Sequence, residues 1–237
     1  MWHWLGRVGF ADAVPLQERL RAAVIEGGGP ETLLLLEHEP VITMGRSASA
    51  GNVLVNEADL ARRGITLAPA SRGGDVTYHG PGQLVGYPVV VLRRGVRAHI
   101  EGMATALAEV LAELGVNAAY RREAPGLWLM GEGAHQKICA FGVNVHRRVA
   151  IHGFALNLDP ILEHFSLIVP CGIAGCPVTS VRARTGVAIR PADVAARVAA
   201  ALGRHLGVDF SWAPHPNVEA TSVSIATAPA ATTMDQA

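Results

Sequence analysis

A cysteine and a lysine are the residues of this sequence best suited to covalent chemistry. Cys171 stands between Pro170 and Gly172, so a fixed bend and an unencumbered following amide present the sulfur outward. That N–H is also suited to stabilising an oxyanion. Lys137 begins an otherwise apolar strand pattern. A nearby ammonium stabilises a thiolate and lowers the thiol pKa from about 8.5, and in an apolar site the lysine then serves as a base.

This pair favours acyl transfer from a thioester, through an acyl-cysteine, to an amine. Thioester exchange is nearly balanced in free energy and amide formation is downhill, so the reaction requires no ATP. Each residue also has an ordinary explanation. A lysine that begins a strand is often a solvent-facing end residue, and most cysteines are small buried hydrophobes. The sequence does not establish that Cys171 and Lys137 are close in space.

A glycine-rich stretch, Arg72 to Gln83, is the third unusual feature. It reads Arg-Gly-Gly-Asp-Val-Thr-Tyr-His-Gly-Pro-Gly-Gln. Glycine lacks a Cβ and admits positive φ, so backbone amides can approach another group closely. The pattern predicts a loop that either holds a ligand or makes a difficult connection between strands.

Periodicity predicts the elements that must position these residues. Apolar residues at helical spacing predict helices over 11–26 (capped by Asp12), 100–114 and 191–206, with short ones at 58–63 and 160–165. Strands are predicted at 32–36, 41–44, 65–67, 84–92, 117–121, 126–130, 138–145 and 149–156, with a turn at Arg147-Arg148 and an irregular segment over 168–182. Pro88 indicates an edge or a bulge within the strand at 84–92.

These elements predict an α/β (α+β) fold with a mixed central sheet and packed helices. We expect a single catalytic domain over residues 1–212. From Ala213 the sequence is rich in Ala, Thr, Pro and Ser with little charge, so residues 213–237 are expected to form a peripheral, mobile tail.

Four blocks in order resemble the lipoyl(octanoyl) transferase family. They are Arg72-Gly-Gly-x-Val-Thr-Tyr-His-Gly-Pro-Gly-Gln83, Lys137-Ile-x-Ala-x-Gly142, His152-Gly-Phe-Ala-Leu-Asn157 and Pro170-Cys171-Gly172. The stretch Val178-Thr-Ser-Val181 is also similar to the family pattern. The resemblance spans roughly residues 30 to 185. Any one block is weak, but the combination is highly specific. Gln136 departs from the family, which often has a basic residue there, and Cys139 replaces a small apolar one.

The resemblance implies the catalytic fold of the biotin and lipoate protein ligases. It also implies octanoyl transfer from octanoyl-acyl carrier protein to a lysine of a lipoyl carrier domain, without a cofactor. The acceptors would be the lipoyl domains of 2-oxoacid dehydrogenase complexes and the glycine cleavage H protein. Cys171 would carry the acyl thioester, and Lys137 would lower its pKa and assist proton transfer. Substrate contacts would map onto Arg72, Gly73, Gly74, Asp75, Val76, Thr77, Tyr78, His79, Ala140, Phe141, Gly142, Gly153, Phe154 and Ala155.

Composition limits the other functions. Twenty basic residues balance twenty acidic ones, so net charge gives no argument for nucleic acid or a membrane. The chain has no signal-peptide pattern and no apolar run of membrane-spanning length, so we expect a cytoplasmic protein, and we expect a monomer. Its three cysteines include no Cys-x-x-Cys pair, and its histidines lack ligand spacing, so no structural metal is predicted. Cys139 is interpreted as a buried filler, although strand alternation would put it on the Lys137 face; Cys176 receives no role.

Three other readings remain open. An ATP-dependent lipoate or biotin ligase needs no cysteine nucleophile, so the Pro-Cys-Gly block argues against it. A non-catalytic module that binds lipoyl domains or acyl carriers is compatible with the glycine-rich stretch and the surface basic pairs. A cysteine hydrolase would need His79 or His152 beside Cys171, and the sequence gives no evidence of that partnership.

Overall fold

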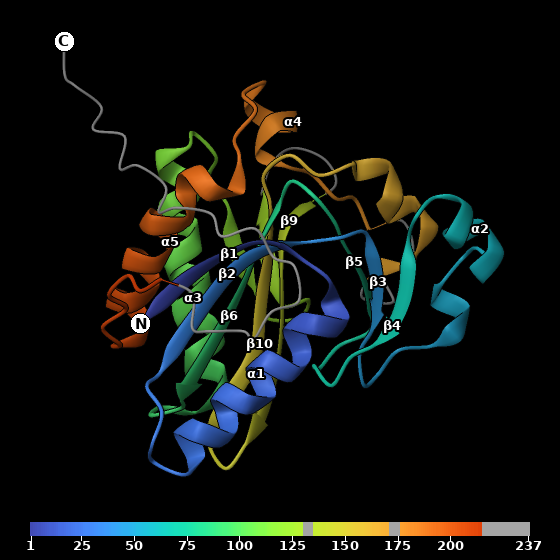
Figure 1. The fold of residues 1–237 in the computed structure, drawn as a ribbon. Coiled ribbons are helices and arrows are strands. Elements are labelled where there is room, and N and C mark those ends of the chain that lie inside the picture. The colour runs from blue at the N-terminus through green and yellow to red at the C-terminus, as the bar shows by residue number, and fades with distance from the viewer. Residues whose placement is uncertain (130–134, 171–175, 215–237) are drawn as a thin grey trace.

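The computed structural model describes residues 1–129, 135–170 and 176–214. A mixed sheet of seven strands forms the centre, in the order β1-β2-β6-β10-β9-β8-β7 (Figure 1). Its strands, in that order, are Trp2–Val8, Thr32–His38, Gln83–Val91, Val149–Asn157, Gln136–His146, Gly126–Leu129 and Ala119–Arg121. Only β1 and β2 run parallel, and each of the other neighbours is antiparallel. The predicted mixed sheet with packed helices is confirmed.

Helices cover both faces of this sheet. Helix α1 (Phe10–Ile25) lies across β6 and β10 on one face, whereas α3 (Gly95–Glu113) and α5 (Pro191–Leu206) pack together on the other (Figure 1). Helix α3 buries Met103, Leu107 and Leu111 at helical spacing. The main core lies between α3, α5 and the sheet. The helices therefore form where apolar periodicity predicted them.

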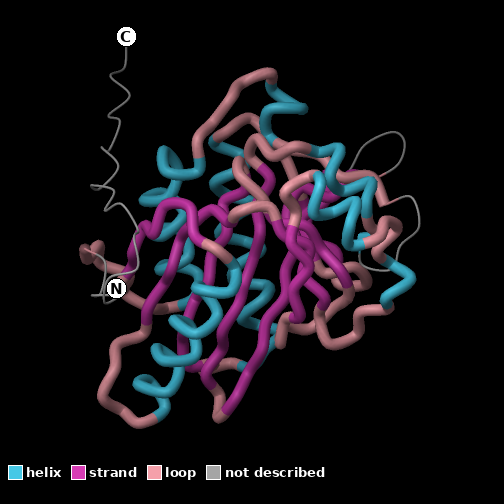
Figure 2. Tube along the Cα trace, turned by 45° about the vertical axis from the view of Figure 1, so that its right-hand side comes forward, coloured by secondary structure: helices cyan, strands magenta, loops and turns pink. Residues whose placement is uncertain are grey.

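A smaller sheet lies beside the large one (Figure 2). Its order is β4-β3-β5, from Thr66–Pro69, Val41–Met44 and Val76–His79. Short helices surround it: η1 (Ala50–Asn52), α2 (Glu57–Arg62) and η2 (Leu162–Leu167), and α4 (Val181–Thr185) follows further along the chain. The glycine-rich stretch therefore contains a strand, β5, that its composition did not predict. Residues 70–75 form the connection that leads into this strand.

Three local predictions need correction. Strand β1 was not anticipated, because its alternation is weak and it lies at the edge of the sheet. Asp12 does not cap α1. The helix begins earlier, with Gly9 as its N-cap, so Asp12 lies in the first turn, where a carboxylate still favours the helix dipole. Helix α4 occupies part of the segment predicted to be irregular.

Pro88 lies in a central strand, so the predicted edge position is wrong. β6 has β2 on one side and β10 on the other. Pairing of β10 with β6 nevertheless stops between Ala150↔Val90 and Phe154↔Gly86, and that register puts His152 opposite Pro88. Proline has no N–H to donate to a ladder. His152 has φ 58 at this gap, so the irregular backbone conformation lies in β10.

The hairpin between β9 and β10 turns at Arg147 and Arg148, as predicted, with φ 45 and φ 67. Residues 211–213 lie along β1, through Trp2 N–H to Ser211 O (2.8 Å) and Ala213 N–H to Trp2 O (3.0 Å). The beginning of the predicted tail is thus attached to the sheet edge, and most of that tail lies outside the described residues. Among the described helices, none is both long and apolar enough to span a bilayer.

Candidate active site

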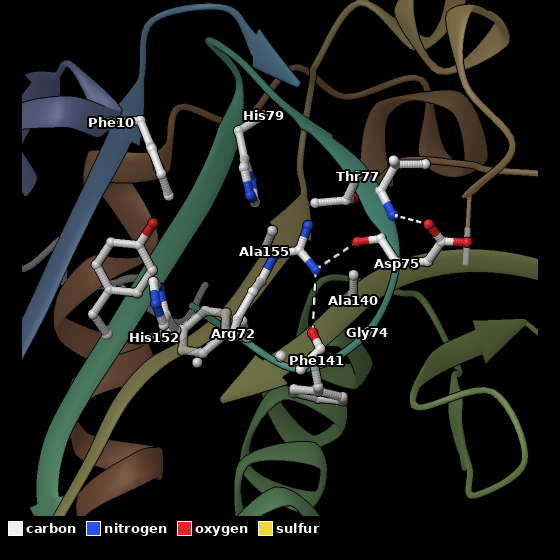
Figure 3. A pocket seen from close by; sticks show the side chains of 16 residues that line it. Phe10, Arg72, Gly74, Asp75, Thr77, His79, Ala140, Phe141, His152 and Ala155 are labelled. Atoms are coloured by element: carbon white, nitrogen blue, oxygen red, sulfur yellow. Dashed lines mark hydrogen bonds between the residues drawn. The ribbon is translucent and has the colours of Figure 1, made fainter. Parts of the chain in front are cut away.

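A cavity lies between the β9–β10 hairpin, the 72–77 segment and the start of α1 (Figure 3). The cavity has a volume of about 60 Å³ and is partly open to solvent. All predicted substrate residues except Tyr78 line it: Arg72, Gly73, Gly74, Asp75, Val76, Thr77, His79, Ala140, Phe141, Gly142, Gly153, Phe154 and Ala155. Three separated sequence blocks therefore converge on one cavity.

Arg72 braces the glycine-rich segment from within. Its side chain is buried, and Nη1 donates to the backbone oxygens of Gly73 (3.2 Å) and Asp75 (2.8 Å). Nη2 donates to the backbone oxygen and to Oγ1 of Thr43 in β3, both at 2.8 Å. Figure 3 shows the guanidinium reaching across the cavity wall. These bonds tie the segment to the small sheet, so Arg72 shapes the wall by its planar fork of donors.

Asp75 turns its carboxylate toward the loop before η1. Oδ1 accepts from the backbone N–H groups of Ser49 (3.2 Å) and Val76 (2.8 Å), and Oδ2 accepts from Asn52 Nδ2. The carboxylate is therefore engaged in holding the loop, although the residue lines the cavity. Its predicted role as a substrate contact stays a prediction.

Tyr78 does not line the cavity. Its ring belongs to the core of the small sheet, where it packs edge-on against Phe165, and its hydroxyl lies 2.8 Å from Nδ1 of His164. Alternation along β5 separates it from His79, which does face the cavity. Tyr78 is thus a core residue of the small sheet, whereas Thr77 and His79 on either side of it line the cavity.

Three cavity or near-cavity histidines are held neutral by burial. His38 has its pKa lowered to about 4 by burial, and His152 likewise to about 4 by burial and then by the charge of Arg72. Burial, then the charges of His38 and Arg72, hold the pKa of His79 well below its usual value. His79 Nδ1 lies 3.1 Å from Gln83 Oε1. Because Gln83 Nε2 donates elsewhere, Nδ1–H donates to Oε1 and Nε2 is the acceptor nitrogen.

Phe10, Tyr87 and His152 complete the lining and were not predicted as substrate contacts. His152 begins one of the four blocks that carry the family resemblance, so there was reason in the sequence to expect it near the site. Phe10, the first residue of α1, and Tyr87, within a buried strand, carried no signal of this kind. Tyr87 donates its hydroxyl to His38 Nε2 at 2.6 Å, because His38 Nδ1–H donates to Val8 O.

Lys137 is a buried residue on β9, the strand that supplies Ala140 to Gly142. Its side chain is only 4% exposed, which excludes the solvent-facing alternative. Nζ lies 4.9 Å from the centroid of the Trp128 ring. Its backbone pairs with a later segment, through Lys137 N–H to Pro177 O (2.8 Å) and Thr179 N–H to Lys137 O (2.9 Å). The backbone of Lys137 is therefore fixed beside the segment that follows Cys171 in sequence, and Lys137 does not itself line the cavity.

Cys171 lies outside the described residues, so the pairing of its thiol with Lys137 stays a prediction. Cys139 is buried in the main core together with Ile138, and burial raises the pKa of its thiol. The charge of Lys137 acts against that rise in pKa, so Cys139 lies within electrostatic reach of Lys137. Cys139 is a core filler. Cys176 is also buried.

Among the described residues, His, Cys, Asp and Glu side chains form no group of three that could ligate a metal ion. The cavity instead offers neutral imidazoles, an aromatic floor and small glycine and alanine positions. Such a lining suits an extended apolar chain with few polar contacts.

Comparisons with known proteins agree on one family. The family model described as "Lipoyl protein ligase A/B catalytic domain" matches residues 10–203. An octanoyltransferase of Myxococcus xanthus is 43% identical over 200 residues, which are 82% of this chain and 56% of that protein. An octanoyltransferase of Geotalea uraniireducens is 46% identical over 199 residues, 83% of this chain and 88% of that protein. The chain thus spans little more than half of the Myxococcus relative but most of the Geotalea one.

A solved structure has the same fold. A bipartite lipoate protein ligase from Thermoplasma acidophilum matches with a TM-score of 0.69 at 18% identity, over 88% of this chain and 84% of that one. At this identity the likeness concerns the fold alone. It agrees with the ligase-type catalytic fold expected from the sequence.

Proposed function

This chain belongs to the lipoyl protein ligase A/B catalytic domain family and is an octanoyltransferase, and from that premise we propose how it acts. The donor is octanoyl-acyl carrier protein. The acceptor is a lysine on a lipoyl carrier domain, in 2-oxoacid dehydrogenase complexes or the glycine cleavage H protein. The octanoyl group passes through a thioester on Cys171. The protein acts as a cytoplasmic monomer without a cofactor.

The cavity holds the octanoyl chain. Gly142 and Gly153 pair across the β9–β10 hairpin and both line the cavity; a Cβ at Gly142 would meet Arg72 Cδ at 3.0 Å, so its absence lets the 72–77 segment lie close to the hairpin. Phe141 and Phe154, the neighbouring cross-strand pair, provide an aromatic wall. Burial of the acyl chain removes apolar area from water, at about 25 cal/mol per Å². This term favours binding of a medium-length chain over a short one.

The observation that carries the proposal is the buried position of Lys137. Its 4% exposure and its backbone bonds with Pro177 and Thr179 hold a buried lysine near the start of β9, the strand that supplies Ala140 to Gly142 to the cavity. Cys171 precedes Pro177 by six positions, so the chain is short enough to bring the thiol to the same region. A buried ammonium beside a thiol favours the thiolate.

Two balanced steps make up the reaction. In the first, the Cys171 thiolate attacks the carbonyl of the octanoyl thioester; a new C–S bond forms, the old one breaks, and the carrier thiolate takes a proton from the Lys137 ammonium, which becomes a neutral amine. In the second, the ε-amino group of the acceptor lysine attacks the acyl-cysteine. The C–N bond forms, the Cys171 thiolate leaves, and the proton lost by the amine passes to Lys137. Neither step consumes ATP.

An ATP-free transfer assay tests the function against its rivals. Purified protein is incubated with octanoyl-acyl carrier protein and an unmodified lipoyl domain, with and without ATP, and the lipoyl domain is weighed by mass spectrometry. We expect full octanoylation in both. A strict requirement for ATP would favour the ligase alternative. Tight binding of either carrier with no octanoylation would favour the binding-module alternative, and release of free octanoate without transfer would favour a hydrolase.

A further inference from the structure

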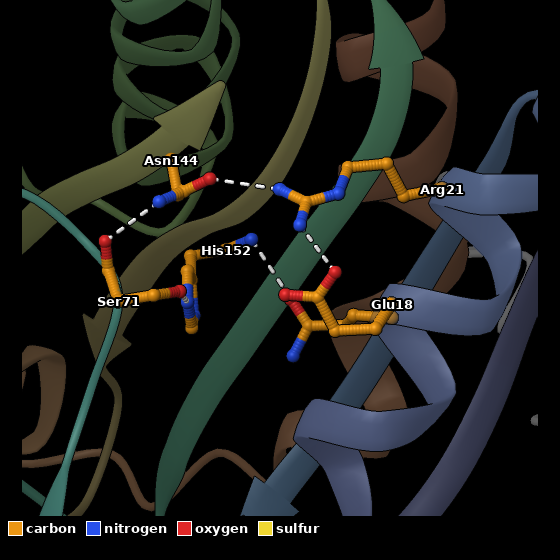
Figure 4. Close-up of polar contacts among 6 residues, drawn as sticks. Glu18, Arg21, Ser71, Asn144 and His152 are labelled. Atoms are coloured by element: carbon orange, nitrogen blue, oxygen red, sulfur yellow. Dashed lines mark hydrogen bonds and ion pairs between the residues drawn. The ribbon is translucent and has the colours of Figure 1, made fainter. Parts of the chain in front are cut away.

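Ser71, the residue before Arg72, is held by two side chains from different strands. Its hydroxyl lies 2.9 Å from Nε2 of His152 in β10. Its backbone oxygen accepts from Nδ2 of Asn144 in β9, at 2.8 Å. Both residues are themselves bonded to α1, Asn144 through its side chain to Arg21 (Figure 4) and His152 through its backbone N–H to Gln17. Ser71 is therefore the point where two hydrogen-bonded relays from α1 meet.

The first relay begins at Gln17, which is completely buried. Its Oε1 accepts from the backbone N–H of His152 at 2.8 Å, and its Nε2 donates to Ala13 O at 3.2 Å. Pairing of β10 with β6 is interrupted at His152, so its backbone N–H bonds Gln17 and not a carbonyl of β6. A buried N–H without a partner is costly. Gln17 thus satisfies an N–H that the interrupted ladder leaves unpaired.

The positive φ of His152 changes the face on which its side chain lies. Ala150, Phe154 and Leu156, at alternate positions of β10, all pack toward α3 and α5. His152 shares their parity, yet its ring stacks on Phe10 at 6.5 Å and lies 2.9 Å from Ser71, on the α1 side. The left-handed conformation at φ 58 breaks the alternation. The Gln17 bond therefore stabilises a backbone conformation that presents His152 to the cavity.

The second relay begins at Arg21, one turn further along α1. Its Nη1 donates to Asn144 Oδ1 at 2.7 Å, and its Nη2 pairs with Glu18 on the same helix (Figure 4). Because Asn144 accepts through Oδ1, its Nδ2 points to Ser71 O. The two relays thus reach different atoms of Ser71, the hydroxyl through Gln17 and the carbonyl through Arg21.

We propose that Gln17 and Arg21 of α1 are positioning residues for octanoyl transfer, which hold the acyl-binding segment 72–77 against the β9–β10 hairpin by fixing Ser71. The neighbouring Gly73 N–H donates to Val143 O at 3.0 Å, so the segment lies on the hairpin directly after the anchor. The kinetic part of this inference, an effect on KM, rests on the proposed use of the cavity for the octanoyl chain. The positional part, the fixing of segment 72–77 through Ser71, does not depend on that use.

Hydrogen exchange in the free protein tests the positional part without substrate. Gln17→Leu keeps the approximate size of the side chain and removes its acceptor, and Arg21→Met removes the guanidinium. Leu20→Ala is the matched control, because Leu20 packs on the same helix within the α1-side core and has no hydrogen bond to either relay. We expect at least tenfold faster exchange in the peptide covering 71–77 for Gln17→Leu and Arg21→Met. Equal protection in these variants and the wild type overturns the proposal.

Steady-state kinetics with octanoyl-acyl carrier protein test the consequence. Gln17→Leu should raise KM about tenfold with less than a threefold change in kcat, since it disturbs binding and not the thiol. In a Ser71→Ala background this effect on KM should fall below threefold, because the Ser71 hydroxyl that His152 contacts is then absent. The effect of Arg21→Met, which acts through the carbonyl, should persist there.

The possible failures are distinct. A Gln17→Leu effect of equal size in both backgrounds, or an equal rise in KM for Leu20→Ala, overturns the relay. Faster exchange at 71–77 with unchanged KM supports the positioning role but contradicts the use of this cavity for the acyl chain. Loss of octanoyl transfer in the Cys171→Ala protein would support the thioester route, whatever the exchange and KM measurements show for the relays.

Discussion

The ammonium of Lys137 lies over the face of Trp128, with Nζ 4.9 Å from the ring centroid. The aliphatic part of the lysine crosses Gly126, where an added Cβ would meet Lys137 Cε at 2.6 Å. Trp128 is fixed in turn by its Nε1–H, which donates to Ala124 O at 2.9 Å. Strand β8 thus places the Trp128 ring under the Lys137 ammonium and, at Gly126, leaves room for the aliphatic part of the lysine side chain.

Loss of that aromatic face should reduce the reactivity of Cys171. A desolvated cation–π contact contributes up to about 2 kcal/mol, so Trp128→Leu should slow iodoacetamide labelling of Cys171 at pH 7 by two- to tenfold and shift its pH profile upward. Trp128→Phe retains a ring face and should stay within about twofold of the wild type. If Lys137→Met slows labelling but Trp128→Leu does not, the ring has no part in holding the ammonium.

Gly73 and Gly153 should respond differently to alanine. A Cβ at Gly73 would meet only Val143 O, at 3.7 Å, whereas one at Gly153 would meet Gly86 O at 2.3 Å and Pro88 Cδ at 2.7 Å. Gly73→Ala should fold normally and narrow the cavity, so that the ratio of kcat/KM for hexanoyl over octanoyl substrates rises about fivefold or more. Gly153→Ala should unfold at clearly lower temperature. An unchanged chain-length preference in Gly73→Ala would place the acyl chain elsewhere.

Arg72→Lys should impair binding despite the retained charge. The lysine cannot reproduce the fork that reaches Thr43, Gly73 and Asp75 together. We expect a rise in KM of about tenfold or more, with acylation of Cys171 still detectable at high substrate concentration. Wild-type KM in Arg72→Lys would mean that charge alone matters at this position.

His99 should make the fold sensitive to acid. Burial lowers its pKa to about 4 from its usual value of 6.5, and its Nε2 is buried without a hydrogen-bond partner among the described residues. The unfolded chain therefore binds the extra proton first, and stability falls as pH drops from 6.5 toward 4. His99→Leu should remove about 2 kcal/mol of the loss in unfolding free energy between pH 7 and pH 5. Parallel urea-unfolding curves for variant and wild type at both values would contradict this.

Much of the fold could be predicted from periodicity. Helices α3 and α5 have strong apolar stripes that end at Gly115 and Gly207, both with positive φ. The β9–β10 hairpin and the strand after Pro81 were equally clear. Strand β5 was missed, because glycine and polar residues around Val76–His79 hide a short strand that only β3 completes.

The residues that line the cavity could be predicted where they belong to the recognised sequence blocks. They could not be predicted where the backbone departs from regular strand geometry. The three lining blocks converge as expected. Tyr78 was assigned to the cavity because alternation within β5 was not considered, and its ring lies in the small-sheet core. His152 faces the cavity only because of its left-handed conformation opposite Pro88, which no side-chain pattern encodes. Gln17, a polar residue inside a helix, gave no sign of its partner in β10.

The central claim is that octanoyl transfer passes through a thioester on Cys171. The most direct test is the intact mass of the protein after brief incubation with octanoyl-acyl carrier protein in the absence of acceptor. We predict one octanoyl adduct on the wild type, released by neutral hydroxylamine and mapped to the peptide that contains Cys171, and none on Cys171→Ala. An octanoyl adduct that persists on Cys171→Ala, or a Cys171→Ala protein that still transfers octanoyl to the lipoyl domain, would contradict the account.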